Sequence, residues 1–563
     1  MKNAIARVLA AVLILAAGAL NHAYGQDASF DIVRFQIEGN SILPTERAQE
    51  LVAPFVGQRR NYGDVQKALE ALEGEFRRLG YGTVQVYVPE QELTTGVVRL
   101  QVSEGVIGKV TITGNKYFND ANVRAGLPDL KEGSAPNMRK LSENVQLSNE
   151  NPAKQVEVTL GVSEDEGKVN ARIEVKEEDP DRLYLTLDNT GTKASGKHRL
   201  GIAYQNANLG NSDQVLTLAY TTALDPPGGM KILGNRILPW QDGNGVKVDI
   251  FSIGYRLPLY ALGDSIDFIY GNSSTDTPSS SPTLGTGLGI NGKGEVFGFR
   301  YNHIFPRAGE YTSRLVFGLD YKYMNSRCAI NGNPTPFGIA GCTPHTFRPV
   351  SATYSGQWQK PGQAIDFNVG VVHHLFPMGS RFVYAAAPGG YDRYSAASGY
   401  QTKDEFTALR FGGSYTAALS GDWLLRIAAS GQHANNALPA GERLGVAGST
   451  AVRGFLERAV AVDRGYFANI EGYSPDIAAS LGLPGNLKWL VFYDFAQGFN
   501  LNPSVNQKVN IASLGVGLRY NINKDVSARL DIARVMDGLW PNGAPNIALA
   551  GDIRGHFGVA YGF

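Results

Sequence analysis

The sequence contains one arginine whose neighbours would hold it in a defined direction. Arg453 lies in the stretch GSTAVRGFLERAV, between small residues and a Gly-Phe pair. Gly454 permits a tight turn there, because glycine reaches positive φ without a steric cost. The turn would aim the guanidinium at one target, and its planar fork of donors suits a carboxylate. Taken alone, Arg453 is more typical of a solvated loop arginine.

Other residues that could do chemistry give weaker patterns. Cys328 and Cys342 lie in a turn-rich stretch without metal-ligand spacing, so a disulfide closing one loop is predicted, with two free thiols as the alternative. Glu471, in DRGYFANIEGYSPD, is interpreted as part of a polar network rather than as a catalytic acid. No nucleotide motif, zinc spacing or Gly-x-Ser-x-Gly turn is present in the sequence. We therefore expect no catalytic residue, metal site, cofactor or nucleic-acid partner.

The N-terminus has the features of an export signal. Lys2 and Arg7 give a positive start, residues 8–20 form an apolar run, and a small-residue cleavage site, AYG, follows. The apolar run is too short to span a bilayer comfortably, which disfavours an anchor helix. Residues 1–25 are therefore predicted to be a signal peptide, with the mature protein beginning near Gln26. No later run of about 18 apolar residues predicts a transmembrane helix.

Composition and charge divide the remaining chain. The 67 glycines, 10% aromatic residues and only 18% charged residues are typical of an exported outer-membrane barrel, although a secreted β-sandwich shares them. Residues 26–180 contain 18 Lys and Arg against 25 Asp and Glu, whereas residues 181–563 contain 32 against 27. The sequence pattern changes near the same point, which predicts two regions in different surroundings.

The acidic region contains two related α/β modules. In the first, a strand ending in a turn precedes two helices and two strands, and the second helix has an apolar face at helical spacing. The strand and turn recur, because VRFQIEGNSIL and VTITGNKYF both end in Gly-Asn at Gly39 and Gly114. A helix and two strands follow the second copy. The shared element order predicts a duplication, with modules at 26–105 and 106–180.

Residues 181–563 alternate between large apolar and small or polar side chains. In SLGVGLRY, for example, Leu514, Val516 and Leu518 share one face, opposite Ser513 and two glycines. This length holds roughly 16 strands of about 10 residues, and closure removes the sheet edges that lipid cannot satisfy. A mainly β fold with a C-terminal 16-stranded transmembrane antiparallel barrel is therefore predicted.

The final strand, GHFGVAYGF, adds to this prediction. Its outward residues resemble the assembly signal of bacterial outer-membrane barrels, and they are Phe557, Val559, Tyr561 and Phe563.

Several stretches together carry a family resemblance. They are SNENPAKQVEVTL, LDNTGTKASGKHRLGIAYQNANLGNSDQV, FSIGYRLPLY, GERLGVAGSTAVRGF and LVFYDFAQGF. The chain resembles the two-partner secretion transporters of the haemolysin and filamentous-haemagglutinin secretion/activation group over nearly its whole mature length. The resemblance implies that the two α/β modules are periplasmic POTRA (polypeptide-transport-associated) modules ahead of an outer-membrane barrel. The implied function is export of one large exoprotein, captured by the POTRA modules and passed through the barrel without ATP.

The same parts also occur in a different functional class. An assembly factor that inserts other barrels is the alternative, and the two modules and the SNENP and LDNTGTKASG stretches favour the transporter. A diffusion porin does not need POTRA modules, and an enzyme has the least support. The partners implied by the resemblance are a secreted exoprotein, outer-membrane lipids and the barrel-assembly machinery during biogenesis.

The resemblance also implies a target for Arg453. In this superfamily the sixth extracellular loop, here around 440–465, folds back into the barrel, and its arginine pairs with an acidic residue of a Phe-x-Asp-x-Gly wall motif. The two motifs match Val452, Arg453, Gly454 and Phe455 in the loop, and Phe492, Asp494 and, at the glycine position, Ala496 in the wall. The methyl group of Ala496 adds volume where the loop packs against the wall, so it affects how deeply the loop enters the barrel. Alternation in WLVFYDFAQ supports a lumenal Asp494, because the opposite assignment would place a carboxylate in hydrocarbon.

Overall fold

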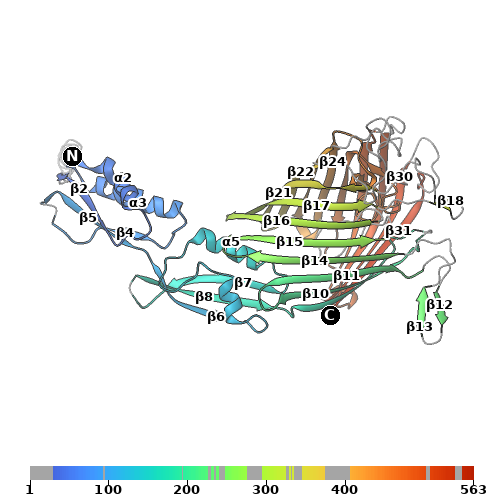
Figure 1. Cartoon of the computed structure of the whole chain (residues 1–563), viewed down its shortest axis with the longest axis horizontal. Helices are drawn as coiled ribbons and strands as arrows, with labels where there is room; N and C mark the ends of the chain where they lie inside the picture. The colour runs from blue at the N-terminus through green and yellow to red at the C-terminus, as the bar shows by residue number, and fades with distance from the viewer. Residues whose placement is uncertain are drawn as a thin grey trace, which may run out of the picture. The chain divides into compact units, whose positions relative to one another are not determined.

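The computed structural model shows small α/β modules followed by a large β region (Figure 1). It describes residues 29–563 except 93–94, 166, 193–194, 226–229, 234–235, 240–247, 275–293, 325–328, 331–332, 335–344, 375–405, 502–507 and 539–547. The predicted signal peptide and both cysteines of the predicted disulfide, Cys328 and Cys342, lie outside the described residues.

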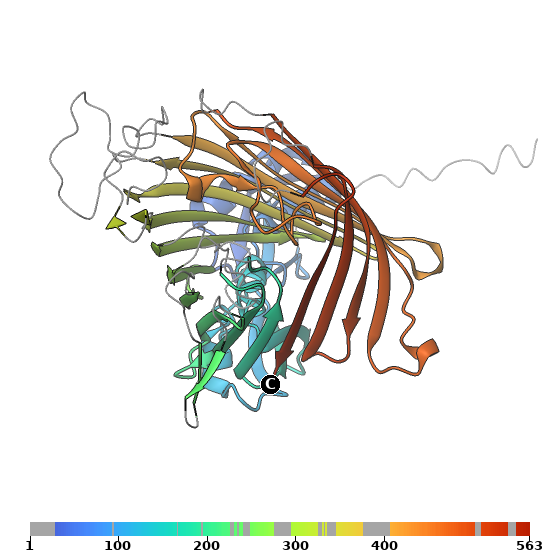
Figure 2. The same ribbon diagram turned by 90° about the vertical axis from the view of Figure 1, so that its right-hand side faces the viewer.

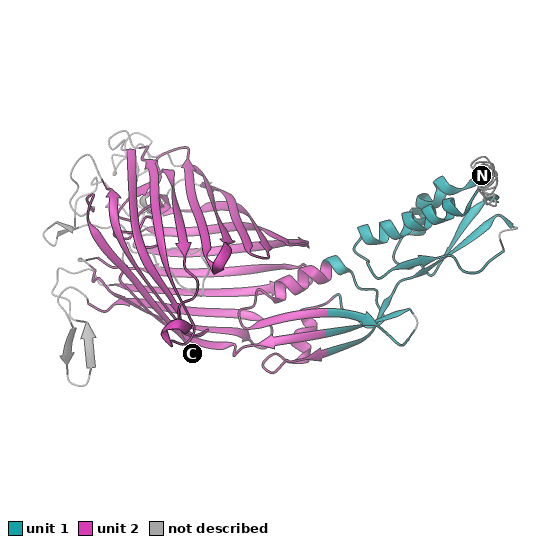
Figure 3. Cartoon of the chain, turned by 180° about the vertical axis from the view of Figure 1, so that it is seen from behind, with its two compact units in different colours: residues 1–111, 129–139, 159–172 teal, residues 112–128, 140–158, 173–563 magenta. Residues whose placement is uncertain are grey.

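The chain divides into two compact units (Figure 3). Unit 1 is made of residues 1–111, 129–139 and 159–172, and unit 2 of residues 112–128, 140–158 and 173–563. The second predicted module therefore contributes residues to both units. The module boundaries predicted above remain a proposal.

The first module is built on a three-stranded sheet in the order β2-β5-β4, with β2 parallel to β5, and β1 pairs separately with β3. Its elements are β1 (Phe30–Ile32), β2 (Arg34–Glu38), α2 (Thr45–Val52), η1 (Ala53–Phe55), β3 (Gly57–Arg60), α3 (Tyr62–Arg78), β4 (Gln85–Tyr87) and β5 (Val97–Ser103). The strand-helix-helix-strand-strand order matches the prediction. The β1–β3 pair was missed, because three or four residues such as GQRR are too short and too polar to show alternation.

Local sequence explains the bounds of α3. A capping box starts the helix: Asp64 N donates to Asn61 Oδ1 at 3.1 Å, and Asn61 N donates to Asp64 Oδ2 at 3.2 Å. Leu72 and Phe76 are buried on its apolar face, and the helix ends before Gly80, which adopts φ +100°. Pro44 is the N-cap of the preceding helix, α2.

The second module contains β6 (Val106–Thr113), α4 (Asp120–Ala125), α5 (Met138–Ser148), β7 (Lys154–Val162) and β8 (Lys168–Glu177), with the sheet order β6-β8-β7. The repeated Gly-Asn turn has the same backbone in both modules. Gly39 has φ +76° and Gly114 has φ +88°. A Cβ at Gly39 would lie 2.3 Å from the carbonyl oxygen of Val102, and one at Gly114 would lie 2.3 Å from that of Val175. Only glycine fits either position, which accounts for the repeated motif.

Sixteen antiparallel strands close into a barrel, which confirms the predicted fold (Figures 1 and 2). They are β9 (Asp181–Asp188), β10 (Arg199–Leu209), β11 (Gln214–Ala223), β14 (Asp249–Leu259), β15 (Asp264–Ser273), β16 (Gly294–Ala308), β17 (Tyr311–Met324), β20 (His345–Phe347) continued by β21 (Pro349–Lys360), β22 (Gln363–His374), β23 (Thr407–Ala418), β24 (Leu424–Ala434), β27 (Arg464–Tyr473), β28 (Asn486–Phe499), β29 (Lys508–Asn521), β30 (Val526–Asp537) and β31 (Ile553–Gly562). Both β20 and β21 pair with β17.

Small elements interrupt the connections between barrel strands. They are the pairs β12 (Met230–Leu233) with β13 (Arg236–Pro239), β18 (Ala329–Ile330) with β19 (Asn333–Pro334) and β25 (Leu444–Gly445) with β26 (Ala461–Val462), and the turns η3 (Ser420–Asp422), η4 (Ala440–Glu442) and η5 (Ala479–Leu481). No helix in the described ranges is long and apolar enough to cross a membrane.

Strand alternation places apolar side chains outside the barrel. Leu514 and Val516 of β29 are exposed, whereas Ser513 of the same strand is buried. The barrel closes where β31 pairs with β9, and Phe563 and Leu183 exchange two backbone hydrogen bonds of 2.8 and 2.9 Å. The exposed residues Val559, Tyr561 and Phe563 of the predicted assembly signal therefore lie at the closing seam.

Candidate functional site

Loop 6, residues 435–463 between β24 and β27, packs against the inner wall of the barrel. Its apolar residues form one buried cluster with the wall strands β28, β29 and β30. The cluster comprises Val446, Ala447, Val452, Phe455, Val460 and Val462 from the loop and Ala496, Val509, Ile511 and Val535 from the wall. Fully burying an aliphatic or aromatic side chain stabilises by about 1.5–3 kcal/mol, so this contact supports docking of the loop. Ala496 accommodates its extra methyl group within the cluster.

The turn at Gly454 sets the direction of Arg453. Gly454 adopts φ +95°, and a Cβ there would lie 3.2 Å from Val535 Cγ2 and 3.4 Å from Ala533 Cβ. The Gly454 amide donates to His556 Nε2 at 3.0 Å. A side chain at this position would be strained and crowded, which explains the glycine in the motif.

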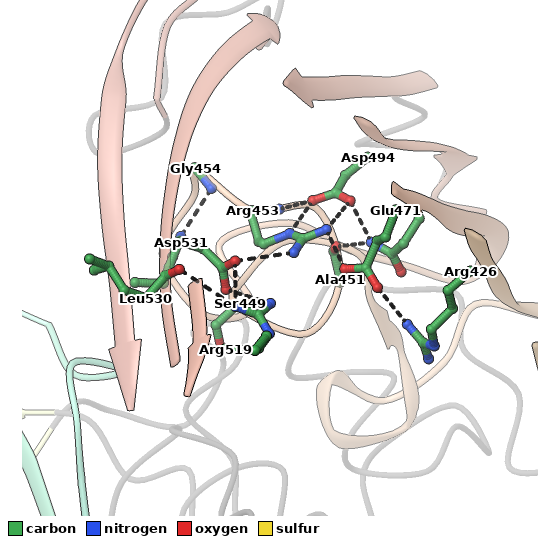
Figure 4. A network of polar contacts seen from close by, with 12 residues as sticks. Arg426, Ser449, Ala451, Arg453, Gly454, Glu471, Asp494, Arg519, Leu530 and Asp531 are labelled. Carbon is green, nitrogen blue, oxygen red and sulfur yellow. Dashed lines mark hydrogen bonds and ion pairs between the residues drawn. The ribbon is translucent and has the colours of Figure 1, made fainter. Parts of the chain in front are cut away.

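Arg453 and Asp494 are brought together inside the barrel (Figure 4). Arg453 Nε donates to Asp494 Oδ2 and Nη2 donates to Oδ1, both at 2.7 Å, so the pair is bidentate. The Arg453 amide also donates to Asp494 Oδ2 at 3.1 Å. Asp494 is 0% exposed and Arg453 3% exposed. The guanidinium lies over the ring of Phe492, with Cζ 3.4 Å from the ring centroid, which adds a cation–π contact.

Two further carboxylates contact the same guanidinium (Figure 4). Glu471 Oε1 lies 2.9 Å from Arg453 Nη2, and Asp531 Oδ1 lies 3.4 Å from Nη1. Each has a second cation: Glu471 pairs with Arg426 at 3.0 Å and Asp531 with Arg519 at 2.9 Å. The resulting network contains three cations and three anions and is electrically balanced. We call it the charge lock, made of Arg426, Arg453, Glu471, Asp494, Arg519 and Asp531.

Sequence reasoning did not assign Glu471 and Asp531 as partners of Arg453. Glu471 was interpreted as a member of a polar network, whereas Asp531 was not singled out. Alternation in β30 places Asp531 on the lumenal face, so its orientation was available from the sequence. The sequence does not show where the tip of loop 6 lies on the wall, and that position brings Arg453 within reach of carboxylates on β27, β28 and β30.

A second anchor holds the beginning of loop 6. The buried Glu442 carboxylate contacts Lys322 Nζ of β17 at 2.6 Å and Arg410 Nη2 of β23 at 2.7 Å. Burial alone would raise the pKa of Glu442, but the charges of Lys322 and Arg410 outweigh it and lower the pKa to about 2. Glu442 belongs to the stretch GERLGVAGSTAVRGF, one of those that carry the family resemblance. In the structure its carboxylate ties the start of loop 6 to the barrel wall.

A third polar cluster joins the second module to the barrel turns within unit 2. Lys154 Nζ of β7 is buried and lies 2.5 Å from Asp213 Oδ2, in the turn between β10 and β11. Tyr260, in the turn between β14 and β15, donates its hydroxyl to the same Asp213 oxygen at 2.6 Å. Asn151 Nδ2 donates to the carbonyl of Ala207 at 2.7 Å. Burial lowers the pKa of Lys154, and the charge of Asp213 opposes this change.

This junction cluster unites three of the stretches that carry the family resemblance. Lys154 belongs to SNENPAKQVEVTL, Asp213 to the stretch ending in NSDQV, and Tyr260 to FSIGYRLPLY.

Among the described residues, no group of three or more His, Cys, Asp or Glu side chains is arranged to hold a metal ion.

Comparison with known proteins places the chain in a family. The family model described as "Haemolysin secretion/activation protein ShlB/FhaC/HecB" matches residues 167–333 and 363–520. The chain belongs to this family. The model for the POTRA domain of the ShlB type matches residues 30–105.

Individual relatives are distant but cover most of the chain. The heme/hemopexin transporter protein HuxB of Haemophilus influenzae is 20% identical over 529 residues, covering 91% of this chain and 85% of HuxB. The solved structure of CdiB from Escherichia coli has a TM-score of 0.69 at 18% identity, covering 96% of this chain and 92% of CdiB. CdiB from Acinetobacter baumannii gives 0.66 at 14% identity. These two likenesses show the shared fold.

Family membership settles the broad function. The chain is an outer-membrane transporter of the two-partner secretion type, with its POTRA region in the periplasm, and it translocates an exoprotein to the cell exterior. The family consists of transporters and not of known enzymes.

Proposed function

We propose that the charge lock keeps loop 6 docked in the resting transporter and releases it when one specific exoprotein passes through the barrel without ATP. The observation that carries this proposal is the burial of Arg453 among three carboxylates contributed by three different wall strands. A docked loop occupies lumenal space that an extended polypeptide needs. Displacement of the loop is therefore part of the transport cycle.

The lock is suited to repeated opening. If Arg453 leaves, Glu471 keeps Arg426 and Asp531 keeps Arg519. Asp494 keeps a hydrogen bond from Asn469 Nδ2 at 2.8 Å. Buried charges without partners are costly, so these remaining contacts limit the free energy needed to undock the loop.

The POTRA region supplies cargo capture in this proposal. The sheet order β2-β5-β4 leaves β2 and β4 at the edges of the first module. An extended cargo segment can add to such an edge through backbone hydrogen bonds. Removal of residues 30–105 should therefore abolish export and leave the barrel assembled. Lipids and the barrel-assembly machinery are the further proposed partners, during insertion.

A reversible tether tests the role of the loop. Gly454→Cys with Ala533→Cys, in a Cys328→Ser and Cys342→Ser background, places two thiols at positions whose Cβ atoms would be 3.4 Å apart. Oxidised cells should stop exporting the exoprotein and accumulate it in the periplasm, and reduction should restore export.

The single Gly454→Cys variant, oxidised in the same way, controls for strain at the turn. Full export by the cross-linked protein would show that the loop does not need to move. Loss of many outer-membrane barrels without a specific missing exoprotein would instead support an assembly factor.

A further inference from the structure

A row of positive charges lies on the lumenal face of the barrel near the charge lock. The strand register places Lys488 of β28 directly opposite Arg519 of β29, and Arg519 directly opposite Arg529 of β30. Lys488 has the same strand parity as the lumenal Asp494, and Arg529 the same parity as Asp531. Like charges directly opposite each other across strands are destabilising. The sheet therefore carries an unfavourable arrangement at this position.

Neutralisation of the row is incomplete. Arg519 pairs with Asp531 at 2.9 Å. Within the described part of the chain, no carboxylate forms an ion pair with Lys488 or Arg529. The charge of Arg529 acts on Glu457 and that of Lys488 acts on Asp476, but neither carboxylate forms an ion pair with the cation.

The row lines a cavity of about 720 Å³ inside the barrel. Arg426 lines the same cavity from β24, which one strand, β27, separates from β28, so four cationic side chains line it. Asp188 is the single carboxylate among the described lining residues, and its Oδ1 already accepts a hydrogen bond from Thr190 N at 2.9 Å. The lining also includes Asn486, the first residue of β28, and Asn521, the last residue of β29. The strand registers place both at the same end of the barrel as the start of β9, which follows the periplasmic POTRA region, so the cavity lies toward the periplasmic mouth.

The cavity and the charge lock share side chains. Arg426 and Arg519 line the cavity, and they also pair with Glu471 and Asp531. Those two carboxylates in turn contact Arg453. An anion that binds in the cavity therefore competes with the outer carboxylates of the lock for the same guanidinium groups.

We infer that this cavity is a binding site for carboxylate side chains of an extended acidic segment of the exoprotein. The inference rests on the proposed function, because binding of the segment would be the step that perturbs the charge lock from the periplasmic side. The closed barrel wall separates the cavity from lipid, which makes a polypeptide in the lumen the relevant source of anions. Arg426, Lys488, Arg519 and Arg529 supply the charge-assisted hydrogen bonds.

The test uses purified full-length protein in planar lipid bilayers. A hexaglutamate peptide added at the periplasmic side should block the current, whereas hexalysine at the same concentration should not. Lys488→Gln with Arg529→Gln should raise the concentration for half-block at least roughly tenfold, because both unpaired cations are lost. Lys488→Arg with Arg529→Lys should keep the block.

Lys360→Gln with Lys524→Gln is the matched control. It removes the same charge from two exposed positions outside the cavity, one at the end of β21 and one in the turn between β29 and β30, and its block should equal that of the wild type. Heat-dependent gel mobility verifies that each variant is a folded barrel.

Three results would overturn the inference: equal block of the wild type and the double glutamine variant, equal block by hexalysine, or equal block by inorganic phosphate at matched charge. Export of the exoprotein is measured in the same variants. Normal export together with any of these results would reject the acidic-segment site and leave the transport function intact.

Discussion

The three carboxylates around Arg453 predict unequal effects for the two residues of its bidentate pair. Arg453→Ala removes the cation from three anions and from the Phe492 ring. Loss of one partner of a buried ion pair typically costs about 3–5 kcal/mol. Asp494→Ala leaves Arg453 with Glu471 at 2.9 Å, so the expected cost is that of one charged hydrogen-bonded contact, about 1.5–3 kcal/mol.

These free energies convert into populations of the undocked loop. Since about 1.4 kcal/mol corresponds to a factor of ten, Arg453→Ala should raise the undocked fraction by roughly a hundredfold to a few thousandfold. Asp494→Ala should raise it by roughly ten- to a hundredfold. The double variant should resemble Arg453→Ala, because Asp494 has already lost Arg453 in that variant and its removal breaks no further contact of the pair.

A buried cysteine in the loop measures this fraction. Ala447 is 3% exposed in the docked loop, so Ala447→Cys in a background without Cys328 and Cys342 reacts with a maleimide only after undocking. Labelling rates in outer membranes are compared for the single and double variants. Multiplicative effects of Arg453→Ala and Asp494→Ala on the rate would refute the lock, as would complete rescue by Arg453→Lys, which lacks the bidentate fork.

Four other outcomes are expected. Deleting Phe563 removes the two backbone hydrogen bonds to Leu183 at the seam and should lower the amount of heat-modifiable barrel, with no loss expected for Phe563→Tyr. Glu442→Gln should increase maleimide labelling of the loop, because Lys322 and Arg410 lose their anion. Lys154→Met should lower the temperature of barrel unfolding by stranding Asp213, and adding Asp213→Leu should restore most of the loss, since a buried ion pair can be replaced by apolar residues. In unit 1, hydrogen bonds from Arg78 lower the pKa of Glu75 to about 2. The protection of α3 amides against hydrogen exchange should therefore hold above about pH 4.5 and fall as the pH approaches 2. Glu75→Gln should remove this pH dependence.

The sequence predicted the features that repeat along the chain. Alternation placed Asp494 in the lumen and Trp489 toward lipid. The two residues lie on opposite faces of the strand, so the choice of face that keeps the carboxylate out of lipid also turns the indole toward it. The Gly-Asn turns predicted a duplication, and Gly39 and Gly114 do occupy backbone positions that exclude a Cβ. These inferences depend on local chemistry, which a single sequence contains.

Contacts between distant segments were harder to predict. Lys154 and Asp213 are both charged residues beside turns, where solvent exposure is the ordinary expectation. Their pairing became visible only when the fold placed the start of β7 against the turn between β10 and β11. In the same way, the register of three strands decides that Lys488, Arg519 and Arg529 form a row.

The charged residues of loop 6 have a consequence for the response of the channel to voltage. Residues 435–463 contain Glu442, Glu457 and Asp463 against Arg443, Arg453 and Arg458, so the segment has no net charge. Moving one elementary charge through a membrane potential of 100 mV contributes about 2.3 kcal/mol, and a neutral segment moving as a whole gains none of this work. An applied potential therefore gives little force for undocking.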